Sequence, residues 1–285
     1  MYDQSSPSSR PGSGRTLQGA WTGLALAIAG AALLFTGLRG CSEAPGSGAL
    51  PVVSPVPVSS TEYFRLTQAT TFTSIPAAPP DQDPFTVTDG LVVHPMTPQI
   101  VYAAPGGKPI AVLPTTELGG PTWVPVVQNN PGWDLVLLPS RPDRATGWIF
   151  TDGTAGSALM IRVSPYLIWI QVGARKLSVY DDSVSQGTWT VAVGAPQTPT
   201  PTGRTFLLAL LAPQDPTYSP LILPLGTHSN ALSTFGGGPG TVGLHGWPNP
   251  SVFGQAVSNG CVRVPAAALQ LLSHIPLGTL VLITQ

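Results

Sequence analysis

Most of the chain after residue 85 consists of short apolar runs separated by turn residues. Between residues 85 and 152 the runs are LVVHP, IVYAAPGGKPIAVLP, TWVPVVQNNPGWDLVLLP and GWIF. Runs of four to eight residues broken by Gly, Pro or Asn are typical of antiparallel strands. Trp123, Trp133 and Trp148 could form a ligand-binding surface, but we expect them to pack in the core, because each ring buries a large area. A small β-barrel domain is therefore predicted over residues 85–152.

The carboxy-terminal part, residues 158–285, continues the strand pattern and adds one helix. Its apolar runs are IRVSPYLIWIQV, KLSVYDD, GTWTVAVG and RTFLLALL. Helical spacing occurs only between Pro265 and His274, where Pro265 suits a first helical turn and Pro276 cannot continue a helix. We therefore expect a mainly β chain with one late helix.

The amino-terminal end has a different pattern. Residues 16–38 carry no charge and are apolar enough to cross a ~30 Å hydrocarbon core as a helix. Residues 1–15 contain Arg10 and Arg15, so the positive-inside tendency places this tail in the cytoplasm. The sequence thus predicts a cell-membrane anchor, with the remainder of the chain extracytoplasmic.

Two alternatives remain open for this end of the chain. The apolar run could belong to a cleaved secretory signal, although it is longer than the ~7–15 residues usual for one. The sequence from Leu38 to Cys41 resembles the lipobox of bacterial lipoproteins, which would make Cys41 a lipidated residue, but Arg39 stands where a small residue is usual. Residues 39–84 are rich in Pro, Ser and Gly, and we expect an extended spacer there.

Composition narrows the class of protein. The chain has 12 basic and 13 acidic side chains and a net charge of −1, which argues against nucleic-acid binding. Its 32 glycines and 33 prolines exclude coiled coils and long helical bundles, whereas a hydrophobic content of 42% can still form a core. Cys41 and Cys261 cannot form a disulfide scaffold. No metal-ligand spacing is present, and we expect neither a metal nor a cofactor.

The residues around Cys261 point to nucleophilic catalysis. A catalytic thiol needs a base and backbone donors for an oxyanion. In the run Ser258-Asn259-Gly260-Cys261, Gly260 permits an unusual backbone angle that lets neighbouring amides converge. His245, sixteen residues upstream, is the candidate base if the intervening loop returns to the strand end. Taken alone, such a cysteine is usually a buried small hydrophobe and an Asn-Gly pair an ordinary turn.

Several segments resemble known families. VYAAPGGKPIAVLP, with GWI as a closing strand, is similar to bacterial SH3-like domains. GLHGWPNPSVFGQAVSNGCVRV resembles the signature of the L,D-transpeptidase catalytic domain, a His-Gly followed by Ser-His-Gly-Cys and then Arg or Asn two residues on. VAVGAPQTPTPTGRTFLL and LGTLVLIT resemble two further segments of that family, so the resemblance covers about residues 158–285. Asn259 stands where the family has His, which puts a role for that second imidazole in doubt.

This resemblance implies an L,D-transpeptidase-like β-sandwich that acts on peptidoglycan stem peptides. By it, Cys261 attacks the carbonyl of the third residue of a tetrapeptide stem, releases D-Ala and forms a thioester, which an amine of a neighbouring stem resolves as a 3→3 cross-link. His245 is implied as the base, or as the imidazolium partner of a preformed thiolate, with its ring oriented by the Gly246 carbonyl. The amides of Gly260 and Cys261 are implied as the oxyanion hole, with Asn259 near it.

Other residues are candidates for substrate contact. Arg263 would order the loop or meet a substrate carboxylate, and Arg204 is a second candidate for a charged stem. Tyr218 and Trp247 would line the groove, with core packing as the alternative. His228 lies in a predicted loop and would border the cleft or simply be solvated.

Three functions therefore remain open from the sequence. The first is a transpeptidase of peptidoglycan biosynthesis, hence of cell-wall organisation and cell shape. The second is an L,D-carboxypeptidase or D-amino-acid exchange enzyme, in which water or a free D-amino acid resolves the same thioester. The third is a non-catalytic wall-binding protein that works through the SH3-like segment. The expected partners are peptidoglycan stems and, through the amino-terminal helix, the membrane; a monomer is expected.

Overall fold

The structure is a computed structural model that describes residues 51–151, 159–235 and 237–285. These residues belong to one compact unit, residues 49–285. The predicted tail 1–15, the predicted membrane helix 16–38 and Cys41 lie outside the described residues. Within the described ranges, no helix has the length and apolar character needed to cross a membrane.

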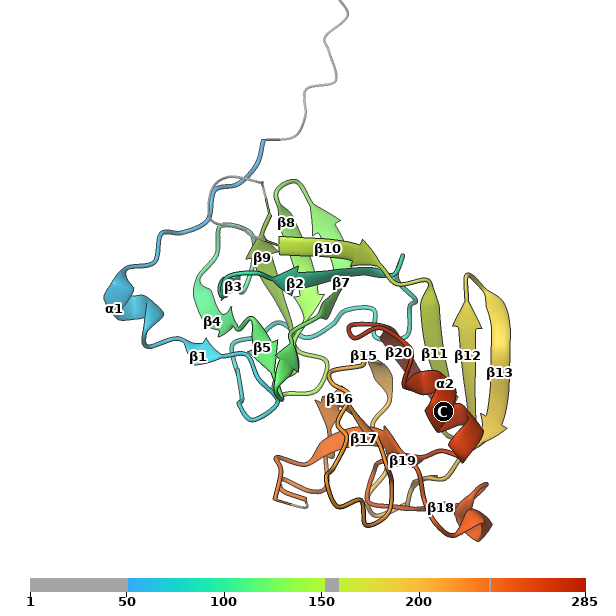
Figure 1. Ribbon diagram of the computed structural model, residues 1–285. Coiled ribbons are helices and arrows are strands. Elements are labelled where there is room, and N and C mark those ends of the chain that lie inside the picture. Colours follow the sequence, from blue (N-terminus) through green and yellow to red (C-terminus); the bar gives the residue numbers. More distant parts are fainter. Residues whose placement is uncertain (1–50, 152–158, 236) are drawn as a thin grey trace, which may run out of the picture. The chain divides into compact units, whose positions relative to one another are not determined.

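The described chain is mainly β, as predicted (Figure 1). Helical turns are short: α1 (Ser60–Tyr63), η1 (Pro250–Val252) and α2 (Ala266–Leu272). The strands of the amino-terminal region are β1 (Thr67–Gln68), β2 (Leu91–Pro95), β3 (Gln99–Tyr102), β4 (Pro109–Leu113), β5 (Thr116–Glu117), β6 (Gly120–Pro121), β7 (Val124–Asn130), β8 (Trp133–Leu137), β9 (Thr146–Phe150) and β10 (Leu159–Val163). Those that follow are β11 (Tyr166–Gln171), β12 (Lys176–Asp181), β13 (Val184–Thr190), β14 (Val193–Gly194), β15 (Gly203–Phe206), β16 (Ile222–His228), β17 (Thr241–His245), β18 (Ala256–Ser258), β19 (Val262–Arg263) and β20 (Leu280–Thr284).

The apolar runs between residues 85 and 152 form strands where the pattern predicts them. They join one sheet in the order β1-β4-β3-β9-β8-β7-β2-β10. Alternate side chains such as Val93, Val101 and Ile149 are fully buried, which is why these runs are apolar at every second position or more. Trp123, Trp133 and Trp148 are buried, as expected. The same core includes Phe206, Leu208 and Leu280, so it extends into the carboxy-terminal part of the chain.

The extended spacer expected over residues 39–84 needs correction from residue 51 onward. Strand β1 pairs in parallel with β4, and Ala69 and Ile75 are buried in the core. Asp81 is also buried, where its carboxylate binds the Arg204 guanidinium. The proline content predicted an extended spacer because proline favours extended backbone conformations. An extended chain can, however, also pack against the surface of a folded domain, as this segment does.

The carboxy-terminal part begins later than residue 158. Strand β10 pairs with β2 of the preceding sheet, so residues 159–163 belong to that sheet. From residue 166 the chain forms a sheet in the order β13-β12-β11-β20-β15, whose β11, β12 and β13 lie side by side in Figure 1. Two smaller sheets, β14-β18 and β16-β17-β19, carry the segments around Cys261.

The late helix predicted over 265–274 is α2. Pro265 precedes it as the N-cap residue, and Ser273 is its C-cap. Ala268, Leu269 and Leu272 are its buried residues and pack with strands β11, β17 and β20 in one cluster. The helix thereby shares a core with β17 and β19, the strands that hold His245 and Arg263.

Candidate active site

His245 and Cys261 lie on neighbouring strands. Strand β17 ends at His245, and β19 begins directly after Cys261. The two strands are parallel, with Leu244 opposite Val262 and His245 opposite Arg263. The fifteen residues between His245 and Cys261, 246–260, therefore form the return loop that the sequence required.

The strand register places both side chains on one face. Residues opposite each other in a sheet point to the same side, and the side alternates along each strand. His245 and Arg263 are thus on one face, and Cys261, two residues before Arg263, points to the same face. Gly243 directly precedes the paired residues of β17, and its backbone amide lies close enough to Cys261 to lower the pKa of the thiol.

The His245 ring is held in one orientation. Its Nδ1 lies 2.7 Å from the Gly246 carbonyl oxygen. A carbonyl only accepts, so Nδ1 carries the proton and Nε2 keeps its lone pair for a substrate or thiol proton. The Gly246 N–H in turn donates to Ser219 Oγ at 2.7 Å, so the residue that orients the ring is itself fixed. The expected role of Gly246 in orienting His245 agrees with this geometry.

The pKa values of the two groups are shifted toward their neutral forms. Burial lowers the pKa of His245; the hydrogen bond to Gly246 raises it, and the charge of Arg263 lowers it further. Burial raises the pKa of the Cys261 thiol, against the lowering effects of the Gly243 N–H and Arg263. Of the two protonation states left open by the sequence, these directions favour a neutral thiol beside a neutral imidazole that acts as a base.

The loop before Cys261 is tightly bonded. Ser258 is buried, and its hydroxyl donates to the Cys261 carbonyl oxygen and accepts from the Gly260 N–H at 3.1 Å. Gly260 has φ +115°, a conformation that favours glycine. The Gly260 N–H is thus already bonded, which differs from the expected pair of oxyanion donors. The Cys261 N–H makes no hydrogen bond to any described residue and is the amide left for an oxyanion.

The Thr-Pro segment holds this loop, a role that the sequence reasoning missed. Thr200 Oγ1 donates to the Gly260 carbonyl at 2.8 Å and accepts from the Gly194 N–H at 2.9 Å. Thr198 Oγ1 donates to the Ser258 carbonyl at 2.8 Å. The alternating Thr and Pro residues of TPTPTG could have indicated this role. Proline has no backbone N–H to donate, so the threonine hydroxyls are the donors with which this segment can hold a neighbouring loop.

Tyr218, Trp247 and Arg263 surround His245. The Tyr218 ring meets the His245 ring edge-on, with centroids 4.9 Å apart, and the Trp247 centroid is 5.7 Å from that of Tyr218. The Arg263 guanidinium carbon lies 3.5 Å from the Trp247 ring centroid. This cation–π contact fixes Arg263 over Trp247 and keeps its charge close to Cys261. These three predicted residues are therefore brought together.

A groove leads away from this cluster. It has a volume of about 750 Å³ and is lined by Tyr218, Gly246 and Trp247 and by residues of α2. All of its lining residues are uncharged. Asn259, within the Ser258–Cys261 loop, is exposed, so its amide can meet a ligand.

Two predicted substrate residues lie elsewhere. His228 is fully buried on β16, with Nε2 2.8 Å from the Thr71 carbonyl and Nδ1 3.3 Å from Asp143, so it neither borders the groove nor is solvated. Arg204 is buried and makes two hydrogen bonds to Asp81, at 2.6 and 2.7 Å. The predicted role in substrate contact was wrong for both side chains. Their partners come from residues 71–143, and no local sequence pattern links those residues to them.

The amino-terminal region also supports the backbone beside the nucleophile loop. The Arg141 guanidinium donates to the carbonyls of Ser229, Leu232 and Pro239 at 3.0–3.3 Å. A Cβ placed on Gly260 would lie 3.9 Å from the Ser229 side chain. Arg141 therefore holds the segment that packs against Gly260.

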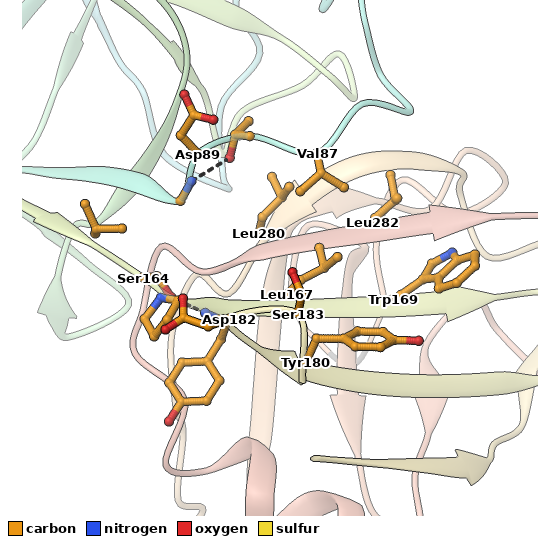
Figure 2. A pocket seen from close by; sticks show the side chains of 15 residues that line it. Val87, Asp89, Ser164, Leu167, Trp169, Tyr180, Asp182, Ser183, Leu280 and Leu282 are labelled. Carbon is orange, nitrogen blue, oxygen red and sulfur yellow. Dashed lines mark hydrogen bonds between the residues drawn. The ribbon is translucent and has the colours of Figure 1, made fainter. Parts of the chain in front are cut away.

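A second cavity, of about 540 Å³, lies on the outer face of the β11–β12–β20 sheet (Figure 2). Leu167, Trp169, Tyr180, Leu280 and Leu282 point into it, with Val87 and Asp89 at its edge. It contains none of the residues around Cys261 and no nucleophile paired with a base. Among residues 51–151, 159–235 and 237–285, no group of three or more His, Cys, Asp or Glu side chains is arranged to hold a metal ion.

Comparison with known proteins identifies the family. The L,D-transpeptidase catalytic domain matches residues 165–283. YkuD of Bacillus subtilis (strain 168), named as an L,D-transpeptidase, is 31% identical over 156 residues, which cover 52% of this chain and 85% of YkuD. The chain belongs to the L,D-transpeptidase family. This agrees with the family resemblance of residues 158–285, and the match begins at residue 165, just before β11.

Two further comparisons give the range of similarity. YkuD of Bacillus licheniformis is 35% identical over 121 residues, covering 42% of this chain and 66% of that protein. A solved L,D-transpeptidase from Mycobacterium smegmatis has 17% sequence identity and a TM-score of 0.36, covering 57% of this chain and 82% of that one.

Proposed function

We propose that this L,D-transpeptidase joins peptidoglycan stem peptides through a thioester on Cys261. The observation that carries the proposal is the shared face of Cys261 and His245, with His245 Nδ1 bound to Gly246 so that Nε2 can accept a proton. A thiol, an oriented base and an unbonded amide are what acyl transfer by a cysteine requires.

In the first half-reaction, His245 Nε2 takes the proton of the Cys261 thiol as sulfur attacks the carbonyl of the third stem residue. The Cys261 N–H stabilises the oxyanion that forms. The carbon–nitrogen bond to the terminal D-Ala then breaks, and the imidazolium gives its proton to the leaving amine. The product is a thioester on Cys261 and free D-Ala.

In the second half-reaction, an amine of a neighbouring stem attacks the thioester carbon. His245 accepts a proton from this amine, the carbon–sulfur bond breaks, and the proton passes to the sulfur as the thiol is restored. The uncharged groove of Tyr218 and Trp247 is one approach to His245 and suits the acceptor stem. Arg263 supplies positive charge beside the site and is the candidate for meeting a stem carboxylate.

The remaining assignments extend this proposal. Residues 16–38 anchor the enzyme in the cell membrane as a monomer with its catalytic part toward the wall, and lipidation at Cys41 is the alternative. Residues 85–152 are a wall-facing SH3-like barrel, a proposal supported by strands β2 to β9 at the positions of the resembling runs. The mass of the mature amino terminus tests the anchor, because an intact Met1 excludes lipidation at Cys41.

Incubation with disaccharide-tetrapeptide tests the reaction. A cross-linked dimer with loss of D-Ala is the expected product. Disaccharide-tripeptide alone would instead assign carboxypeptidase activity, and incorporation of an added D-amino acid would assign exchange. Unchanged tetrapeptide from a folded protein would contradict catalysis and leave a wall-binding function.

A further inference from the structure

A short proline-rich segment crosses a cluster of aromatic rings far from Cys261 in the sequence. The segment is residues 51–57, PVVSPVP, called here the strap. The rings are Tyr102, Trp133, Trp148 and Phe150, called here the aromatic groove. Tyr102 and Trp133 meet edge-on with centroids 5.2 Å apart, and Trp133 and Phe150 with centroids 5.0 Å apart.

Two ring donors bind the strap backbone. Trp133 Nε1–H donates to the Val53 carbonyl at 2.7 Å, and the Tyr102 hydroxyl donates to the Val56 carbonyl at 3.1 Å. The two carbonyls are three residues apart. A polyproline II helix has three residues per turn, so carbonyls at this spacing point to the same side.

The strap sequence favours that conformation. Its three prolines fix their own φ near −65°, and the residues before Pro55 and Pro57 are restricted to extended conformations. Residues 51–59 form no helix or strand, and Ser59, which follows the strap, has φ −71° and ψ 157°. A ligand bound only through its carbonyls also suits proline, which has no N–H to satisfy.

The two ring donors of the aromatic groove are buried, whereas the valine side chains of the strap are exposed to solvent. Trp133 and Tyr102 are 0% and 4% exposed, but Val52, Val53 and Val56 are 40–52% exposed. Val53 also packs at Gly106, where a Cβ would come within 2.6 Å of the valine side chain. Without the strap, the Trp133 indole N–H and the Tyr102 hydroxyl would lose these hydrogen-bond partners. The groove therefore needs a carbonyl-bearing chain, while the strap itself buries little side-chain surface.

We propose that the aromatic groove is a binding site for polyproline II chain and that the strap is its resident intramolecular ligand. The site selects uncharged, proline-containing extended segments with carbonyls one polyproline II turn apart. When the strap is released, residues 51–57 become free chain, adding up to about 22 Å of extended length before α1 at ~3.1 Å per residue. A docked strap thus shortens the connection between the first 50 residues and the enzyme.

A peptide-binding experiment on the full chain tests the site. The probe is a fluorescently labelled peptide with the sequence of residues 49–59, and binding is measured by anisotropy. In a strap variant, Pro51→Gly with Pro55→Gly and Pro57→Gly, the probe is expected to bind at least about tenfold more tightly than in the unaltered chain, because the intact strap competes at an effective concentration in the millimolar range. A probe with its prolines replaced by glycine is expected to bind more weakly to the same variant.

Matched tyrosine variants locate the binding. In the strap variant, Tyr102→Phe removes one donor and is expected to weaken probe binding about fivefold or more, while Tyr180→Phe, in the outer cavity, leaves it unchanged. Failure of a folded strap variant to bind the probe, or equal effects of the two substitutions, overturns the proposal.

A second measurement does not depend on the folding of the strap variant. In the otherwise unaltered chain, Tyr102→Phe is expected to speed hydrogen exchange of the Trp133 indole N–H about fivefold, since it weakens strap docking, with Tyr180→Phe again as control. An indole exchange rate that is the same in both variants contradicts a docked and releasable strap.

Discussion

The Nδ1 of His245 lies 2.7 Å from the carbonyl oxygen of Gly246, the next residue in the chain. Because the Gly246 carbonyl orients the imidazole, no Asp or Glu carboxylate is needed to orient it. Such an arrangement suits a chain with few charged side chains. The contact fixes the tautomer and leaves Nε2 as the acceptor. Because Gly246 is itself bound by Ser219, the orientation is set by β17 and the loop before β16 rather than by the substrate.

The pH dependence of acylation should follow His245. Its pKa is lowered by burial and by Arg263, so the imidazole is neutral, and active as a base, from below pH 6.5 upward. The rate of acylation is therefore expected to rise with pH through a midpoint below 6.5 and to level off above that midpoint. Stopped-flow measurement of the rate of acylation by a carbapenem, from pH 4.5 to pH 8, gives this midpoint.

Removing the charge of Arg263 should move the midpoint of this pH profile to higher pH. Arg263 lowers the pKa of His245, so Arg263→Gln is expected to raise it and shift the midpoint to higher pH. The same change removes the charge that lowers the pKa of Cys261. A midpoint that stays in place or moves to lower pH would show that Arg263 does not act on His245.

Thr200 should matter for both stability and rate. Thr200→Val keeps the shape but leaves the Gly260 carbonyl and the Gly194 N–H without their hydroxyl partner, which should cost about 1–3 kcal/mol in unfolding free energy. Loosening of the nucleophile loop should also slow acylation roughly 10- to 100-fold. Urea unfolding and carbapenem acylation measure the two effects. Thr202→Val is the control, and an equal loss there would remove the special role of Thr200.

Arg141 should stabilise the segment beside Gly260. Arg141→Gln loses donors to three carbonyls, so the amides of Ala231 and Leu232, which bind Ser229 Oγ, are expected to exchange faster with solvent. We also expect slower acylation with unchanged exchange in β11 and β12. Arg65→Gln, at an exposed position, is the matched control. Unchanged exchange at Leu232 in the Arg141 variant would contradict this role.

Arg204 should affect stability rather than substrate binding. Arg204→Met leaves Asp81 as an uncompensated buried charge, which typically costs about 3–5 kcal/mol. The double variant with Asp81→Leu should recover a large part of this loss, and the KM of the folded protein for tetrapeptide should not change. A raised KM with unaltered unfolding free energy would instead return Arg204 to the list of substrate residues.

Local patterns and motifs predicted the strands, α2 and the pairing of His245 with Cys261. These features depend on alternation, on proline at the ends of the helix and on a short motif, all of which are local in the sequence. The contacts of His228, Arg204 and Arg141 join residues 85 or more positions apart, so no local pattern could reveal them. The strap shows the same limit, because proline content predicts extended chain but not the surface that the chain contacts.

The central claim is that Cys261 is the nucleophile, and intact-protein mass after exposure to a carbapenem tests it most directly. The unaltered chain and the Cys41→Ala control are expected to gain one covalent adduct, and His245→Gln to gain it about 10²- to 10⁴-fold more slowly. Cys261→Ala is expected to gain none. An adduct on folded Cys261→Ala, or none on the unaltered chain, would contradict the assignment.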